Sequence, residues 1–378
     1  MADAHTGRIS VSFDAARLAN RVTASLRAYD PGLDLPALRT RFGASLAELG
    51  SNENPLGPPA GAVAAMRAAA ACAHRYPDPR GGALKDALAR RFGVGPESIA
   101  LGNGSHELLM LLAQCFADAD HSVAYSQFGF AVFPIATAAS GARAIAVPAL
   151  PRDHPEMPFG HDPEGLARAV DGGTRLLFVA NPNNPTGTWI DDEALARLLE
   201  RVPETTLVVV DEAYQEYVDA PHLSSALRLQ ARFANLVVTR TFSKAWGLAG
   251  LRIGYLVADA SVVAVLERLR ESFNVNSIAL AAAEAALQDA SHLDRVREWN
   301  RRERDWLVQR LRARGLRVMP SQTNFVLVEF PEGADGVERH LCDRGVAVRP
   351  MGGYGLARCL RISIGTRADN ERLLAALP

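Results

Sequence analysis

Short runs of apolar residues that do not alternate with polar ones recur through the middle of the chain. The clearest lie at 98–101, 175–180, 206–210, 236–239 and 251–257, and helical patterns such as 105–116 lie between them. Runs of this kind are typical of strands buried on both faces of a mostly parallel sheet. The pattern therefore predicts an α/β fold.

Polar residues follow where three of these runs end. Asn181 follows the run 175–180, Asp211 follows 206–210, and Lys244 closes the segment after 236–239. In parallel α/β sheets, ligands bind at the carboxyl ends of the strands. The coincidence predicts a functional site at this edge of the sheet.

The C-terminal part of the chain has a different organisation. A long, charged amphipathic helix is expected at 291–314, with Trp299 and Trp306 seven residues apart, and strands are expected at 324–329 and 359–364. This helix would connect the sheet to a second domain. Nearer the N-terminus, the Ala-rich stretch 60–73 is also expected to be helical, since Ala has high helix propensity.

The composition excludes several classes of protein. Of the 378 residues, 48% are hydrophobic and 22% charged, and the formal net charge of -1 argues against nucleic acid or an anionic membrane as the main partner. No run of about 18 apolar residues could span a membrane, and residues 1–10 do not resemble a secretory signal, so we expect a cytoplasmic protein. The four cysteines form no C-x-x-C pair, and neither a metal site nor a disulfide framework is expected.

The segment 241–252 carries the strongest chemical signal. Lys244 stands beside Ser243, and Arg252 follows eight residues later. A lysine that attacks a carbonyl needs a lowered pKa, which partial burial and a neighbouring cation both favour. A hydroxyl and a guanidinium can together hold a phosphate dianion. Taken alone, however, the segment also fits an exposed loop with an ordinary lysine and arginine.

Three further segments support the chemical interpretation. Asp211 ends a buried run, where a carboxylate needs a cationic partner such as a protonated pyridine nitrogen, and Tyr214 can place its hydroxyl near the same ring. Asn184 can offer its amide to a ring oxygen, although its Pro/Asn-rich segment also fits a simple turn. Ser105 opens a predicted helix whose free N–H groups suit a phosphate, although an ordinary N-cap with Glu107 explains the same residues.

As a set, these residues resemble the fold-type I pyridoxal-phosphate aminotransferases, and a finer pattern resembles the histidinol-phosphate aminotransferase family. The finer pattern consists of the motifs SNENPLGP (51–58), RYPD (75–78), GNGSHE (102–107), NPNNPTG (181–187), VDEAY (210–214) and CLRISIG (359–365). The match is collinear from about residue 29 to the C-terminus. It implies a large domain with a mostly parallel sheet between helices, plus a smaller α/β domain. Residues 1–50 would form an N-terminal arm and part of the small domain, 51–290 the large cofactor-binding domain, and 291–378 the C-terminal small domain.

The resemblance implies pyridoxal 5'-phosphate as the cofactor. Lys244 would form the Schiff base and later move the proton between the substrate α-carbon and the cofactor. Asp211 would keep the pyridine nitrogen protonated so that the ring accepts electrons. Asn184 and Tyr214 would bind the phenolic oxygen, and Phe130 would stack on the ring, where the family usually has Tyr.

The resemblance also implies how the cofactor phosphate is held. The phosphate ligands would be Gly104, Ser105, the backbone N–H of His106, Ser243 and Arg252. His106 departs from the Asp or Asn that is usual in the family, which leaves its backbone contact intact. Tyr76 matches a tyrosine that reaches the cofactor phosphate of the neighbouring subunit. The implied assembly is a homodimer with shared active sites.

The substrate would be bound by Tyr29, Asn54, Arg349 and Arg361. Two arginines and a tyrosine suit a phosphate monoester better than a carboxylate, although a structural salt bridge is an alternative for each arginine. The resemblance implies transfer of the amino group of L-histidinol phosphate to 2-oxoglutarate, giving imidazole-acetol phosphate and glutamate in histidine biosynthesis. Alternatives are an aminotransferase of phenylalanine or tyrosine, a decarboxylase of a phosphorylated amino acid, and a catalytically silent regulator, against which the intact Lys244 and Asp211 speak.

Overall fold

A computed structural model describes residues 13–25 and 32–378 of the chain. Tyr29, a predicted substrate residue, lies outside the described residues. Within them, no helix is both long and apolar enough to cross a membrane. The description below gives the elements that position the candidate site.

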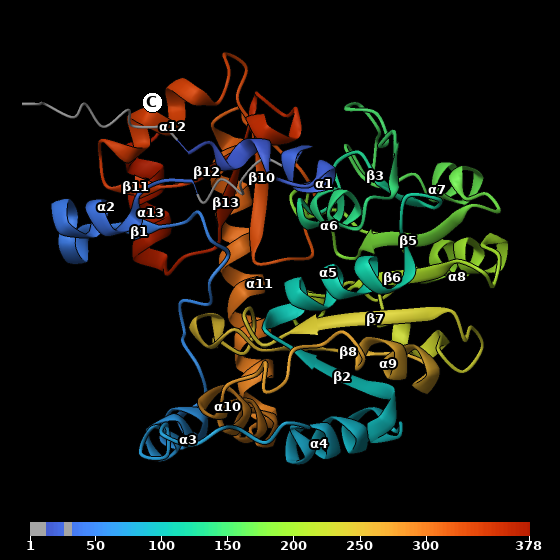
Figure 1. The fold of residues 1–378 in the computed structure, drawn as a ribbon. Coiled ribbons are helices and arrows are strands. Elements are labelled where there is room, and N and C mark those ends of the chain that lie inside the picture. The colour runs from blue at the N-terminus through green and yellow to red at the C-terminus, as the bar shows by residue number, and fades with distance from the viewer. Residues whose placement is uncertain (1–12, 26–31) are drawn as a thin grey trace, which may run out of the picture.

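The larger of the sheets has seven strands in the order β2-β8-β7-β6-β5-β3-β4 (Figure 1). Their bounds are β2 Ile99–Gly102, β3 Ser122–Ser126, β4 Arg143–Val147, β5 Thr174–Ala180, β6 Leu207–Asp211, β7 Leu236–Thr241 and β8 Gly254–Val257. β8 runs antiparallel to both its neighbours, and the other pairs are parallel. The mostly parallel sheet expected from the unalternating runs is therefore confirmed.

Helices cover both faces of this sheet. On one face α5 (Gly104–Phe116), α6 (Val132–Ser140) and α9 (Ala260–Leu266) pack against alternate strand residues such as Val209 and Val237. On the other face α7 (Pro163–Ala169) and α8 (Asp192–Arg201) pack against the intervening residues, such as Val208 and Val210. Strands buried on both faces have no polar face, which explains the runs without alternation.

Further helices and a second group of strands complete the fold. α3 (Ala60–Ala70), α4 (Gly82–Phe92) and α10 (Ser277–Gln288) pack together near β2 and β8. A four-stranded antiparallel sheet has the order β12-β13-β10-β9, and β1 pairs in parallel with β11. The bounds are β1 Ala47–Glu48, β9 Arg317–Val318, β10 Phe325–Glu329, β11 Val346–Ala347, β12 Arg349–Pro350 and β13 Cys359–Ser363.

α11 (Ala290–Ala313) runs between the two groups of strands (Figure 1). The helix ends against the core that α12 (Asp335–Cys342) and α13 (Arg367–Ala376) build over the smaller sheet, while Val296 near its start packs in the core beside α10. The predicted connecting helix at 291–314 is therefore present, as are the strands expected at 324–329 and 359–364. The domain limits at residues 50 and 290 stay predictions.

The remaining elements are short. They are α1 (Arg21–Ser25), α2 (Leu35–Phe42) and the 3-10 helices η1 (Ala15–Arg17), η2 (Gly43–Ser45), η3 (Pro96–Ser98), η4 (Gln215–Tyr217), η5 (Ala226–Leu229), η6 (Ala249–Leu251) and η7 (Gly352–Tyr354). One expected strand starts late: the run 251–257 becomes extended only at Gly254. The reason is that η6 precedes it and Arg252 adopts a left-handed backbone with φ 54°.

Candidate active site

The predicted site residues come from the carboxyl edge of the large sheet. Asp211 is the last residue of β6, and its Cα partners are Ala180 at the end of β5 and Thr239 in β7. Lys244 lies in the loop that follows β7, and Asn184 lies in the loop that follows β5. Parallel strands end at the same edge, so three segments more than 25 residues apart in sequence converge there.

Asp211 is buried, with 3% of its surface exposed, and its Oδ1 accepts a 2.9 Å hydrogen bond from Thr239 Oγ1. Burial raises the pKa of Asp211 to about 6, although the Thr239 bond and the charge of Lys244 act to lower it. A carboxylate in this position is stabilised by a cationic hydrogen-bond donor. A protonated ring nitrogen is such a donor.

Lys244 is half-buried, and its Nζ donates a 3.2 Å hydrogen bond to the carbonyl oxygen of Ser51 and lies 5.8 Å from the ring centre of Tyr214. Burial lowers the pKa of Lys244 to about 7, and the charge of Arg361 lowers it further. Near neutral pH a large fraction of the side chain is therefore the free amine, which can attack a carbonyl or accept a proton.

The loop that carries Lys244 is held from two sides. The carbonyl oxygen of Ala245 accepts hydrogen bonds from Asn54 Nδ2 at 2.9 Å and from His292 Nε2 at 3.1 Å. At Gly247, with φ +69°, a Cβ would lie only 2.5 Å from the carbonyl carbon of Gly57. Asn54 thus positions the lysine loop, and its expected contact with substrate stays a prediction.

Tyr214 is buried beside the lysine and is fixed by contacts with Asn52 and with Phe325 of the smaller sheet. Its hydroxyl accepts a 2.9 Å hydrogen bond from Asn52 Nδ2, and its ring meets Phe325 edge-on at 5.2 Å. Asn52 in turn binds Ser363, with its backbone N 2.9 Å from Ser363 Oγ. Burial raises the pKa of Tyr214 to about 12, so the phenol stays protonated and can donate. Sequence reasoning missed Asn52, although it lies within the quoted motif 51–58.

The N-terminus of α5, Ser243 and Arg252 form a cradle for an anion. Arg252 Nη1 donates to Ser243 Oγ at 3.2 Å and to the Ala249 carbonyl at 3.1 Å. A Cβ on Gly104, the first residue of α5 with φ +76°, would lie 2.8 Å from Arg252 Nη2. The side chain of Asn103, the N-cap residue, does not cap this helix. Helix N–H groups, a hydroxyl and a guanidinium side by side fit a phosphate.

Arg361 and Arg349 lie on the same side of the smaller sheet. Arg361 Nη1 donates to Asn184 Oδ1 at 2.7 Å, and Nη2 donates to the Gly50 carbonyl at 2.7 Å. Arg349 and Arg361 are Cα partners in the antiparallel β12–β13 pair, so their side chains share one face. The Arg349 guanidinium also contacts Gly32, where an added Cβ would overlap Nη1.

The other predicted cofactor residues occupy varied surroundings. Phe130 is half-buried and meets Phe133 edge-on at 6.0 Å, and the His106 side chain is exposed in the first turn of α5. Tyr76 is 84% exposed and stacks on Phe273 at 4.8 Å. Their roles toward the cofactor stay predictions.

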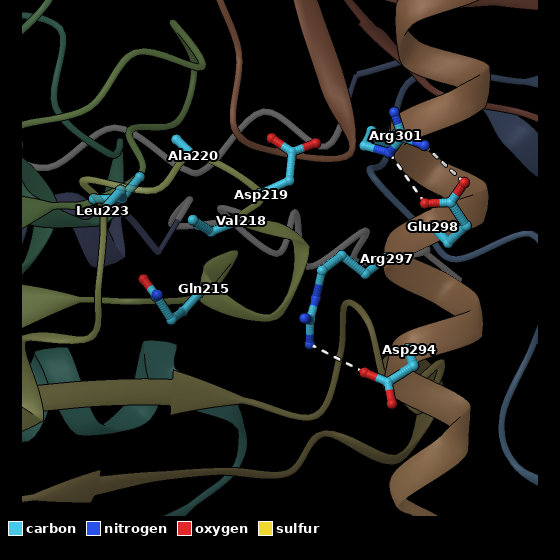
Figure 2. A pocket seen from close by; sticks show the side chains of 9 residues that line it. All are labelled: Gln215, Val218, Asp219, Ala220, Leu223, Asp294, Arg297, Glu298 and Arg301. Atoms are coloured by element: carbon cyan, nitrogen blue, oxygen red, sulfur yellow. Dashed lines mark hydrogen bonds and ion pairs between the residues drawn. The ribbon is translucent and has the colours of Figure 1, made fainter.

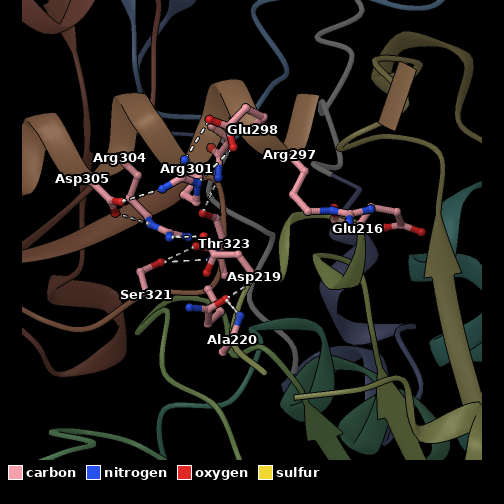
Figure 3. A network of polar contacts seen from close by, with 12 residues as sticks. Glu216, Asp219, Ala220, Arg297, Glu298, Arg301, Arg304, Asp305, Ser321 and Thr323 are labelled. Atoms are coloured by element: carbon pink, nitrogen blue, oxygen red, sulfur yellow. Dashed lines mark hydrogen bonds and ion pairs between the residues drawn. The ribbon is translucent and has the colours of Figure 1, made fainter. Parts of the chain in front are cut away.

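A pocket of about 580 Å³ lies elsewhere, between the segment 215–223 and α11 (Figure 2). Its charged walls are paired among themselves: Arg301 binds Glu298 at 2.8 Å and Arg297 lies 3.5 Å from Asp294. The pairing extends through Arg304 and Asp219 toward Ser321 and Thr323 (Figure 3). None of the predicted site residues lines this pocket, so we place the chemistry at the strand ends.

Comparison with known proteins adds independent information. The family model described as aminotransferase class I and II matches residues 44–377. Histidinol-phosphate aminotransferase 1 of Nitrosococcus oceani is 44% identical over 93% of this chain and 94% of its own, and histidinol-phosphate aminotransferase 2 of Pseudomonas aeruginosa is 45% identical over 96% and 98%. The crystal structure of histidinol-phosphate aminotransferase from Sinorhizobium meliloti in complex with pyridoxal-5'-phosphate has a TM-score of 0.85 at 34% identity, covering 95% of this chain and 96% of that one. Aspartate aminotransferase from Thermus thermophilus with maleate has a TM-score of 0.81 at 26% identity, covering 95% and 99%.

Proposed function

Because the chain belongs to the aminotransferase class I and II family, we propose that it transfers the amino group of L-histidinol phosphate to 2-oxoglutarate with pyridoxal 5'-phosphate as cofactor. The products are imidazole-acetol phosphate and glutamate. The two relatives described above, both named histidinol-phosphate aminotransferase, match nearly the whole chain at 44–45% identity. The observation that carries the proposal is the convergence of an amine with a pKa near 7, a buried carboxyl and a phosphate cradle at one sheet edge.

The chain's residues fit this cofactor, which when bound supplies an electron sink for breaking the C–H bond beside the amino group. Lys244, as a free amine, would take the proton from the substrate α-carbon and deliver it to the cofactor. The buried carboxylate of Asp211 holds the proton on the ring nitrogen, since its low-polarity surroundings favour a nearby cation. The protonated Tyr214 hydroxyl and the Asn184 amide donate to the ring oxygen. Arg252, Ser243 and the first turn of α5 hold the phosphate.

The paired arginines favour a substrate with a phosphate group. A phosphate monoester carries nearly two negative charges and three acceptor oxygens, which two guanidinium groups can use. A carboxylate has one charge and two oxygens, and one arginine suffices for it. Arg349 and Arg361, opposite each other in register, match the first case better.

We also propose that two copies of the chain form the working enzyme in the cytoplasm. Tyr76 is exposed yet stacked on Phe273, and a large aromatic pair at the surface suits a contact with another chain. In this assembly Tyr76 reaches the cofactor phosphate of the second copy.

The substrate assignment is tested by kcat/KM for histidinol phosphate and for phenylalanine in the wild type, Arg349→Ala and Arg361→Ala. Arg349→Ala should lower kcat/KM for histidinol phosphate by roughly 10- to 150-fold more than for phenylalanine, corresponding to about 1.5–3 kcal/mol of charge-assisted hydrogen bonding. Arg361→Ala should impair both substrates. The exposed Arg344 offers a control, and Arg344→Ala should change neither.

Two results would replace the proposal by another. A wild type that prefers phenylalanine, with Arg349→Ala weakening both substrates equally, would identify an aromatic amino acid aminotransferase. Release of carbon dioxide from a phosphorylated amino acid without transfer of its amino group would identify a decarboxylase.

A further inference from the structure

A buried arginine joins two glutamates directly behind the candidate active site. Arg240, in β7, places Nε 2.9 Å and Nη2 2.7 Å from Oε2 of Glu212, and Nη1 3.3 Å from Oε1 of Glu216. The side chains are 9%, 2% and 6% exposed. Charges are rarely buried so fully, and the chemistry proposed above uses none of the three.

The group lies on the opposite face of the sheet from the reacting groups. Asp211 and Thr239 are Cα partners whose side chains bond to each other on one face. Glu212 and Arg240 are the next residues along the chain, and successive residues of extended strands point to opposite faces. The backbone N of Glu212 also donates to the Thr239 carbonyl at 2.9 Å, so the ladder continues to this point. The ion pair therefore joins the ends of β6 and β7 from behind.

Both glutamates belong to the segment that carries the functional side chains. Glu212 follows Asp211, and Glu216 follows Tyr214 by two residues, in η4. Arg240 therefore binds this segment at two points, Glu212 before Tyr214 and Glu216 after it. Glu212 is anchored in addition by the Ala226 backbone N and by Ser225 Oγ, which donates to its Oε2 at 2.8 Å. Lys244 lies four positions after Arg240 in the sequence, so the same ion pair also fixes the start of the loop that carries Lys244.

We propose that Arg240 is a positioning residue, which with Glu212 as its main partner holds Asp211 and Tyr214 in register with Lys244. The role deepens the proposed function and rests on it. A shift of about 1 Å between reacting groups can cost a hundredfold in rate, so a rigid joint between these two strand ends has a direct catalytic value. Lysine at this position would retain the charge but could not bind both glutamates in a planar fork.

The pair also affects the charge on the reacting face. After burial itself, the negative charge of Glu212 is among the causes that raise the pKa of Asp211. Burial likewise raises the pKa of Glu216, while the charge of Arg240 lowers it. Changing the pair should therefore alter the ionisation of Asp211, and with it the pH dependence of the cofactor that Asp211 contacts.

The test compares the holoenzyme of the wild type with Arg240→Lys and with the neutral variant Glu212→Gln/Glu216→Gln/Arg240→Gln. Because Arg240 binds both glutamates, replacing all three residues avoids leaving a buried charge without its partner, which could prevent folding. Arg304→Lys is the matched control, because Arg304 is similarly buried and binds Asp219 at 2.7 Å in a different ion pair (Figure 3). For each protein kcat and KM, the thermal midpoint, and the absorbance of bound cofactor against pH are measured.

Both Arg240 variants should lower kcat by about tenfold or more with KM nearly unchanged, and the neutral variant, which removes the charge of Glu212 near Asp211, should also move the midpoint of the absorbance titration. Arg304→Lys should lower the thermal midpoint but leave kcat and the titration at their wild-type values. If the Arg240 variants lost only thermal stability, as the control does, the positioning role would be refuted while the proposed function stood. A wild type that neither binds the cofactor through Lys244 nor transaminates would overturn both.

Discussion

Replacing Asp211 by Asn should make the protein without cofactor more stable while removing its activity. The substitution keeps the shape of the side chain and an oxygen that accepts the 2.9 Å hydrogen bond from Thr239. It removes only the ability to carry a negative charge. Because the carboxyl is buried, that charge costs free energy in the folded chain before any cation arrives.

The cost follows from the pKa of Asp211, which burial raises from 3.8 to about 6. The difference of about 2 units, at about 1.36 kcal/mol each, amounts to about 3 kcal/mol. The folded chain holds the proton more tightly than the unfolded chain, so this contribution favours folding below pH 3.8 and is lost as the pH rises through about 6. Above that pH, the wild type bears the full cost and Asp211→Asn does not.

The assay is urea unfolding of both proteins, freed of cofactor, at pH 8 and pH 4.5. Asp211→Asn should be more stable by about 3 kcal/mol at pH 8 and by about 1 kcal/mol at pH 4.5. Asp259→Asn is a control, since hydrogen bonds from Ser261 lower the pKa of that exposed carboxyl and the substitution should give no gain. A gain at Asp211 that is equal at both pH values would refute the reasoning, as would near-wild-type turnover of Asp211→Asn.

Borohydride reduction of the holoenzyme should fix the cofactor to Lys244, and peptide mapping is decisive because the chain has only one other lysine, Lys85, which pairs with Glu267 at 3.1 Å. A label on Lys85 would contradict the assignment. In the protein without cofactor, the rate at which a carbonyl reagent labels Lys244 should rise as the pH passes about 7, where its pKa lies, and a rise only near pH 10 would show that burial does not lower it. Inactive Tyr76→Ala and Lys244→Ala subunits should recover activity when mixed, because one site of a mixed dimer then has both residues; no recovery after subunit exchange would count against shared sites.

The sequence alone predicted the parts of the fold that depend on local pattern. Helices cover both faces of the sheet, so runs such as 206–210 and 236–239 have no polar face. The residues of each run are therefore enough to predict that it is buried on both sides. The convergence of Asp211 and Lys244 follows from the same pattern, since parallel strands end at one edge. The long connecting helix was likewise visible in its charged, amphipathic sequence.

The positioning residues could not be predicted in this way. Asn52 reaches the Tyr214 hydroxyl across 162 positions of sequence, and His292 reaches the Ala245 carbonyl across 47. Their partners are set by how the smaller sheet and α11 pack on the large sheet, which no local pattern reports. The Glu212–Arg240 pair depends on the register of β6 against β7, because a shift of one strand by one residue would turn its side chain to the other face and separate the pair.

The two central ionisable groups have pKa values displaced toward each other, Asp211 up to about 6 and Lys244 down to about 7. The attraction between their charges opposes both displacements, so burial is the larger effect at each group. Because burial destabilises the charged form of both side chains, a ligand that carries charges of its own can stabilise them. In the proposed mechanism, a ring nitrogen that carries a proton would give Asp211 a cationic partner, and Lys244, once released from its Schiff base, would be the free amine that proton transfer requires. We therefore expect that the electrostatic cost of burying these two charges is what makes both residues reactive when the cofactor binds.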